Sequence, residues 1–328
     1  MMGSKPLHST KSPARRRDRR HRQTDQRRCR PERLRTYSFL VTLAFIAIVI
    51  GALYVSSLPH VEDIPETFPF NRQAWMKYVP NGAEYVLYVN YDGARASGSS
   101  SVFGMEPLLH LHPYDFDIFP QDVTFEVDVQ FQQGGTVTIT RLHQDSRNAL
   151  QVAFQKTVNA SKSSYQGYDI FGLLMRKGGD QKLQQGFLSL ADDYVIVSDD
   201  QTAGRQAVQR TLDQLVSSEP SLFDDANVRR GIYAAGISNE EYLGLYIGLF
   251  ETQLNFSRMI VKSVVRDGAG ILVTRSILFP SVDIALTQFG EAHRIYRDAS
   301  SYRILDSWLV VAYRYQDASR LKIELTGI

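Results

Sequence analysis

Cysteine is almost absent from this chain of 328 residues, because the single one is Cys29. The roughly 270 residues that follow the apolar run at 37–58 therefore cannot form a disulfide, a thiolate metal site or a cysteine nucleophile. A body of this length can bury enough apolar surface without such crosslinks. The scarcity of cysteine favours a bacterial or archaeal envelope protein over a small secreted eukaryotic module.

Several motifs that carry chemistry are also missing. The chain has no Gly-x-Ser-x-Gly motif, no glycine-rich phosphate loop and no acidic segment with calcium-loop spacing. These absences exclude the familiar classes of enzyme and binding protein that such motifs mark. We expect no cofactor and no catalytic residues, although an enzyme of an unfamiliar type stays open because fold class does not decide function.

Charge is missing from residues 37–58, which read YSFLVTLAFIAIVIGALYVSSL. As a helix, these 22 residues would extend roughly 33 Å, enough to cross a hydrocarbon core of about 30 Å. Lys and Arg are also absent between Arg35 and Arg72, whereas arginines crowd the N-terminal flank. The positive-inside rule then predicts a single-pass signal anchor in the plasma membrane, with the N-terminus cytoplasmic and the C-terminal domain extracytoplasmic.

Two alternatives to a membrane span remain. A cleaved signal peptide would have a shorter apolar core of about 7–15 residues. A core helix of a soluble protein would present a polar face to solvent, and this run has none.

Positive charge is concentrated before the apolar run. Residues 1–36 hold 13 of the 37 Lys/Arg and 3 of the 35 Asp/Glu, so the remainder is mildly acidic, with 24 Lys/Arg and 32 Asp/Glu. Such an arm cannot bury apolar surface, and we expect a disordered, Arg-rich cytoplasmic tail. Anionic lipid headgroups are its favoured partner. Nucleic acid is disfavoured, because no aromatic residue precedes Tyr37 to stack on bases.

The remaining sequence predicts an α+β ectodomain of antiparallel sheets with packed helices. We expect a juxtamembrane spacer over 59–82, because Pro59, Pro65 and Pro69 stand among acidic residues at its start. Residues 123–131 alternate apolar and polar, and the pair Gly134-Gly135 turns the chain into a second strand over 136–140. Apolar stripes predict helices after possible caps at Asp145, Thr202 and Ser281.

A similar order of elements occurs twice along the chain. A strand, a hairpin, a helix and further strands follow one another from residue 84 and again from residue 242, where the closing strands are expected at 308–315 and 321–325. This order predicts two repeated halves, at 83–235 and 236–328.

Three short stretches resemble an uncharacterised family of prokaryotic (bacterial and archaeal) membrane-anchored ectodomains. They are YQGYDIF at 165–171, GFLSLADDYVIVS at 186–198 and SLFD at 221–224, and the opening VPNGAEY at 79–85 is similar to the start of that family. The resemblance covers about residues 77–250. It implies a repeated α+β ectodomain, and it carries no catalytic residue over to this chain.

Metal ligation is the one specific chemistry that the sequence suggests. His110 and His112 alternate, so both could face one side of a strand, with Asp115 and Asp117 close behind. A site needs three or four converging ligands, and the alternative, which we favour, is a polar loop after a short apolar helix. Asn159 and Asn255 begin glycosylation sequons that matter only if the body is exported to a glycosylating compartment.

The sequence thus favours a membrane-anchored extracytoplasmic accessory or structural protein that acts through protein–protein contacts. The alternative is an extracytoplasmic metal- or small-ligand-binding module that uses the His110/His112 region.

Overall fold

The computed structural model describes residues 37–53, 59–70, 72–96, 106–156, 161–177, 182–217, 219–236, 242–249 and 259–316. The chain divides into two units, residues 1–58 and residues 59–328, and we call the second unit the body. In the first unit, residues 37–53 form a helix whose apolar side chains are exposed, among them Phe39 at 66% and Ile48 at 68%. Within the described residues, no helix combines the length and the hydropathy needed to cross a membrane.

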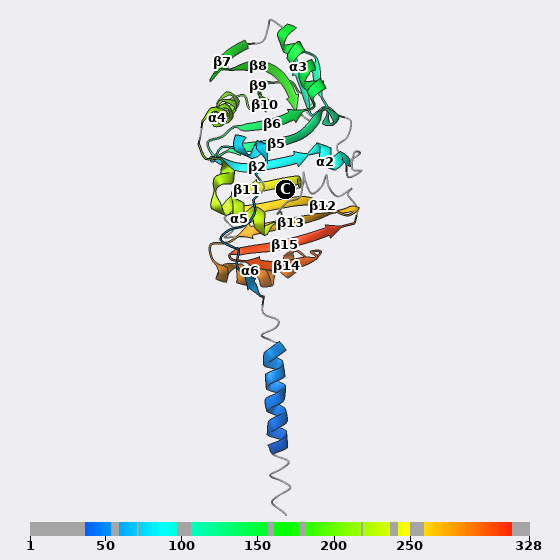
Figure 1. Ribbon diagram of the computed structural model, residues 1–328, viewed down its shortest axis with the longest axis vertical. Helices are drawn as coiled ribbons and strands as arrows, with labels where there is room; N and C mark the ends of the chain where they lie inside the picture. Colours follow the sequence, from blue (N-terminus) through cyan, green and yellow to red (C-terminus); the bar gives the residue numbers. More distant parts are fainter. Residues whose placement is uncertain are drawn as a thin grey trace, which may run out of the picture. The chain divides into compact units, whose positions relative to one another are not determined.

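The body is an α+β unit built on one large, mostly antiparallel sheet (Figure 1), which confirms the predicted α+β class and the antiparallel pairing. Its helices are η1 (Ala74–Tyr78), α2 (Tyr91–Ala96), η3 (Pro120–Asp122), α3 (Gln144–Lys156), α4 (Gly204–Val216), η4 (Leu222–Asp224), α5 (Ala226–Ala234) and α6 (Val282–Ile295).

The strands follow one another across the sheet in the order β1-β14-β15-β13-β12-β11-β2-β5-β6-β10-β9-β8-β3-β4, and β7 also pairs with β8. Their bounds are β1 (Val61–Glu62), β2 (Ala83–Asn90), β3 (Leu109–His112), β4 (Phe116–Ile118), β5 (Val123–Phe131), β6 (Thr136–Leu142), β7 (Ser161–Tyr165), β8 (Tyr168–Lys177), β9 (Gln184–Ala191), β10 (Tyr194–Ser198), β11 (Tyr242–Gly248), β12 (Met259–Asp267), β13 (Gly270–Leu278), β14 (Ser301–Leu305) and β15 (Trp308–Tyr315).

The hairpin β5–β6 forms where the alternating pattern predicted it. Val127 pairs with Ile139 and Val129 with Val137 across the two strands. The turn needs glycine, because Gly134 and Gly135 have φ angles of 83° and 92°, which residues with a Cβ rarely adopt.

Two predicted helix caps have different outcomes. The Ser281 side chain accepts the N–H of Ile284, so the predicted cap of α6 is confirmed. The cap predicted at Thr202 is wrong, because the carboxylate of Asp200 accepts the N–H groups of both Thr202 (2.8 Å) and Ala203 (2.9 Å) before α4 begins. A carboxylate two residues upstream reaches these donors better than the threonine hydroxyl, which itself donates to Asp200.

The strand order follows the same course on both sides of the sheet's centre. On one side it runs β2-β5-β6-β10-β9, and on the other β11-β12-β13-β15-β14, with a helix (α3 or α6) after each hairpin. The two courses meet where β2 and β11 pair antiparallel. This order is what a duplication would give, and the duplication itself stays a prediction. The strand expected at 321–325 lies outside the described residues.

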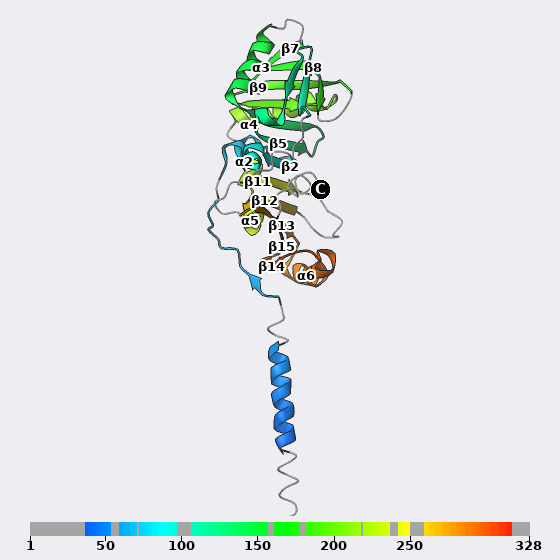
Figure 2. The same cartoon turned by 90° about the vertical axis from the view of Figure 1, so that its right-hand side faces the viewer.

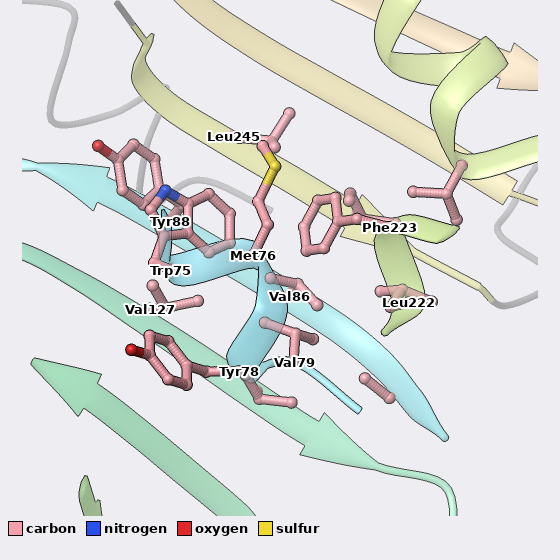
Figure 3. Packing of buried hydrophobic residues seen from close by; sticks show 14 of the residues in the cluster. Trp75, Met76, Tyr78, Val79, Val86, Tyr88, Val127, Leu222, Phe223 and Leu245 are labelled. Atoms are coloured by element: carbon pink, nitrogen blue, oxygen red, sulfur yellow. The ribbon is translucent and has the colours of Figure 1, made fainter. Parts of the chain in front are cut away.

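Residues 59–82, expected as a spacer, pack into the body. β1 pairs in parallel with β14, and in η1 both Trp75 and Met76 are at most 2% exposed. The ring of Trp75 stacks on Tyr88 of β2 with 4.6 Å between centroids and meets Phe223 edge-on at 5.2 Å (Figure 3). The prolines and acidic residues of this segment predicted an extended spacer. Burial of its few large apolar side chains instead holds the segment against the body.

The two faces of the sheet bury their apolar side chains differently. One continuous core spans both halves on the face that α4 and α5 cover, and it includes Val127 of β5 and Leu245 of β11 (Figures 1 and 3). On the opposite face the apolar residues form two separate clusters, one under α6 and one around α3. Polar side chains occupy part of the sheet surface between these clusters.

Candidate functional site

Two carboxylates of β5 lie on the sheet face opposite the continuous core. Glu126 and Asp128 alternate with Phe125, Val127 and Val129, which belong to that core, so strand geometry directs both carboxylates to the other side. The residues paired with them on β6 are also polar: Thr140 opposite Glu126 and Thr138 opposite Asp128. A polar patch thus interrupts an otherwise apolar face.

Lys177, the last residue of β8, supplies the cation of this patch. Its Nζ lies 2.8 Å from Oδ1 of Asp128 and 2.6 Å from Oγ1 of Thr138, whose hydroxyl also donates to Asp128. β9 and β10 lie between β8 and β6 in the sheet order, so the sheet must curl for Lys177 to reach this position. Burial acts to lower the pKa of Lys177, but Asp128 and Glu126 outweigh it and raise that pKa.

Glu126 is the exceptional group of the patch. Burial of its carboxylate, together with the nearby charge of Asp128, raises its pKa from 4.5 to about 7, and Lys177 opposes the rise only in part. Lys177 donates its hydrogen bonds to Asp128 and Thr138, and no described residue donates one to Glu126. Glu126 therefore exchanges its proton near neutral pH.

Two tyrosines share this environment. Burial raises the pKa of Tyr91 at the start of α2, and the charges of Glu126 and Asp128 raise it further. Burial likewise raises the pKa of Tyr85 on β2, whose ring meets Tyr246 of β11 edge-on at 5.3 Å. Both phenols stay protonated and can serve as hydrogen-bond donors, but not as bases.

The patch can hold and release a proton. The patch contains one lysine, Lys177, and two carboxylates, Glu126 and Asp128. Lys177 forms its ion pair with Asp128. No sequence motif distinguishes these residues. The alternation of β5 did place Glu126 and Asp128 on one face, but nothing in the sequence connects them to Lys177.

The residues predicted to bind metal lie on the hairpin β3–β4. His110 and His112 are both on β3, where His110 is partly buried and His112 is exposed, so the favoured reading as a loop after a helix is wrong. Nδ1 of His110 lies 2.7 Å from Oδ1 of Asp117 on β4, and Asp115 is in the turn with a φ of 48°. In the part of the chain that the structure describes, no three His, Cys, Asp or Glu residues form a group suited to a metal ion. The metal site stays a prediction.

Both predicted glycosylation sites, Asn159 and Asn255, lie outside the described residues.

Two adjoining grooves lie at the C-terminal end of α4. The first, of about 260 Å³, lies between α4 and the β5–β6 turn, and the second, of about 460 Å³, lies between α4 and η1. Gln214 and Glu219 line both grooves. The lining is mostly polar, and the grooves are on the face of the continuous core, away from the Glu126 patch.

Comparisons with known proteins assign no family to the chain. No protein-family model matches it, and no curated protein matches it significantly. Crystal forms III, I and IV of a protein named TP0453 are structurally similar, with TM-scores of 0.49, 0.47 and 0.45 and sequence identities of 13%, 12% and 12%. The matches cover 77%, 77% and 75% of this chain and 98%, 96% and 94% of the other. Similarity of this size assigns neither a function nor a partner.

Proposed function

We propose that the chain is a single-pass, membrane-tethered accessory protein whose body lies outside the cytoplasm and acts through contacts with other proteins. The observation that carries this proposal is the run of 22 uncharged residues at 37–58 beside an arginine-rich flank. Removing a run of this length from water is strongly favourable, whereas the arginines cannot follow it into the hydrocarbon.

Exposure of the helix at 37–53 supports the tether. Its large apolar side chains are exposed by 39–68%, among them Phe45 at 66% and Leu53 at 64%. Apolar surface on all sides of a helix is typical of contact with lipid. The arginines of residues 1–36 would then lie at the cytoplasmic leaflet, where each is worth about 1 kcal/mol with anionic headgroups.

Binding is favoured over catalysis by the state of the ionisable patch. Lys177 is engaged by Asp128 and Thr138, so its amine is not available as a nucleophile. The two grooves at the end of α4 lie on the other face of the sheet, away from Glu126. A large folded body joined to a tether is then best explained as a surface for protein partners.

The topology is tested by protease protection. Protease added to intact cells should digest a C-terminally tagged body and leave an N-terminal tag intact, and lysis should expose both tags. A body that resists protease until the cells are lysed would place it inside and would contradict the proposal.

The role is tested by co-purification of the full-length protein from gently solubilised membranes. A control chain carries residues 1–58 fused to an unrelated folded domain. A stoichiometric partner should be recovered with the full-length protein and not with the control. A partner recovered equally with the full-length protein and the control would assign binding to residues 1–58. A full-length protein that purifies as a monomer without a partner in several detergents would contradict the proposal.

A further inference from the structure

The first groove at the end of α4 gathers side chains that form hydrogen bonds with flat, two-pronged groups. Residues with carboxamide, guanidinium and carboxylate side chains line most of it, together with Pro80, Gly82 and Phe131; the polar residues are Gln132, Gln133, Arg210, Asp213, Gln214 and Glu219. Most small-molecule sites are predominantly apolar. The polar lining therefore selects for a ligand that offers many hydrogen-bonding groups.

Several of these side chains are held in place by neighbours. The guanidinium of Arg210 donates to Gln133 and lies 5.6 Å from the ring centroid of Phe131. Both carboxylate oxygens of Asp213 accept the hydroxyl of Tyr165, at 2.9 and 3.0 Å. Polar groups that are fixed before a ligand arrives lose less entropy on binding.

Gln214 joins the two grooves. It is 8% exposed, and its amide N–H donates to the backbone carbonyl of Glu219 at 2.8 Å. No described residue donates to its amide oxygen, although Gln214 lines both grooves. This oxygen is not shut off from water, so it can accept an N–H or O–H group of a ligand that occupies the grooves.

The charges of the grooves favour a neutral ligand. Three carboxylates balance three cationic side chains, namely Asp213, Glu219 and Asp224 against Arg72, Lys77 and Arg210. Arg72 is already paired with Asp224 at 2.8 Å. A phosphate in the grooves would be repelled by the carboxylates of Asp213 and Glu219. An ammonium ligand would be repelled by the guanidinium of Arg210, so the grooves favour neither an anion nor a cation.

We infer that these two grooves form a binding site for a neutral, polyhydroxylated ligand, an oligosaccharide, with Gln133, Arg210, Asp213 and Gln214 as its hydrogen-bonding residues. Hydroxyl groups both donate and accept, which matches a lining of amides, carboxylates and one guanidinium. Two adjoining grooves fit a ligand longer than one sugar unit. The inference goes beyond the proposed protein contacts and does not depend on them.

The experiment uses the full-length protein in lipid nanodiscs. Three neutral tetrasaccharides, maltotetraose, cellotetraose and chitotetraose, are tested by saturation-transfer NMR and titration calorimetry, with inorganic phosphate and spermidine as charged probes. At least one saccharide should bind, and the charged probes should not compete with it.

Matched variants locate the site. Arg210→Gln and Gln133→Ala should each weaken saccharide binding about tenfold or more, as expected when one or two hydrogen bonds to a fixed group are lost. Arg205→Gln and Gln206→Ala, at exposed positions earlier in α4 and outside both grooves, should change it less than about twofold. Thermal unfolding of each variant checks that the body is folded.

Three results would overturn the inference. They are no binding of any of the three saccharides, binding that the Arg210 and Gln133 variants leave unchanged, and binding of phosphate or spermidine that these variants abolish. Loss of saccharide binding would leave the topology and co-purification results untouched, so the two proposals fail separately.

Discussion

Lys177 and Asp128 form an ion pair of 2.8 Å (Nζ to Oδ1) between strands that are separated by β6, β10 and β9 in the sheet order. The pair exists because the sheet curls in this half of the body, as the course of β5 to β9 in Figure 2 illustrates. It fixes the end of β8 against the β5–β6 hairpin and leaves Glu126 with a carboxylate neighbour and no hydrogen bond from that lysine.

Replacement of Asp128 by asparagine should destabilise the body by about 1–3 kcal/mol, because Lys177 would lose its ionic partner in a partly buried position. Equilibrium unfolding of the full-length protein in urea measures the loss. The matched control is Asp193→Asn, since Asp193 pairs with Arg147 but its side chain is 58% exposed, and its change should stay below about 0.5 kcal/mol. Equal losses in the two variants would show that the Lys177 pair is no more important than a surface pair.

Glu126 should make the stability of the body fall as the pH rises. Its folded-state pKa of about 7 lies above the usual glutamate value of 4.5, so the folded protein binds the proton more tightly than the unfolded chain does. The contribution of Glu126 to the free energy of unfolding is therefore fully present below about pH 4.5. It is lost progressively as the pH rises to about pH 7.

Glu126→Gln should remove this dependence. At pH 8 the variant should be more stable than the parent by about 1–3 kcal/mol, and near pH 5 the two should be nearly equal. Urea unfolding at both pH values provides the measurement. A variant that loses stability equally at pH 5 and pH 8 would show that the carboxylate is held by favourable contacts instead.

Asp200→Ala should destabilise the start of α4 by about 1 kcal/mol, because two backbone N–H groups lose their acceptor. Those hydrogen bonds also lower the pKa of Asp200 despite the opposing effect of burial, so its contribution is present above about pH 4 and is lost on acidification. Thr202→Ala is the control and should cost less, since the threonine does not accept these bonds. Unfolding curves that rank the two variants in the reverse order would restore Thr202 as the cap.

Trp75→Ala should cost about 3–5 kcal/mol, as expected for a large aromatic side chain that is 2% exposed. Lys77→Ala, at an exposed position in the same short helix, should cost less than about 0.5 kcal/mol. Thermal or urea unfolding compares them. Similar small effects would mean that residues 59–82 are the spacer that their prolines suggested.

Local pattern was enough for much of the fold. Alternation in residues 123–131 predicted β5 and assigned Glu126 and Asp128 to one face, because side chains in a strand point to opposite sides in turn. The glycine pair at 134–135 predicted the hairpin, and Ser281 predicted the start of α6. Each of these depends on residues that are close in sequence and on backbone geometry that holds in any protein.

The apolar run and its arginine flank are likewise properties of the sequence, as are the cysteine-free body and the absence of familiar catalytic motifs. Tertiary structure alone decided that η1 is buried against β2, that Asp200 outcompetes Thr202, and that Lys177 meets Asp128. It also placed His110 beside Asp117 and brought Gln133 and Arg210 together at one groove. Most of these contacts join residues 7 to 77 positions apart, and a local sequence pattern carries no information about such pairings. The choice of Asp200 over Thr202 depends on which side chain the folded backbone places near the N–H groups.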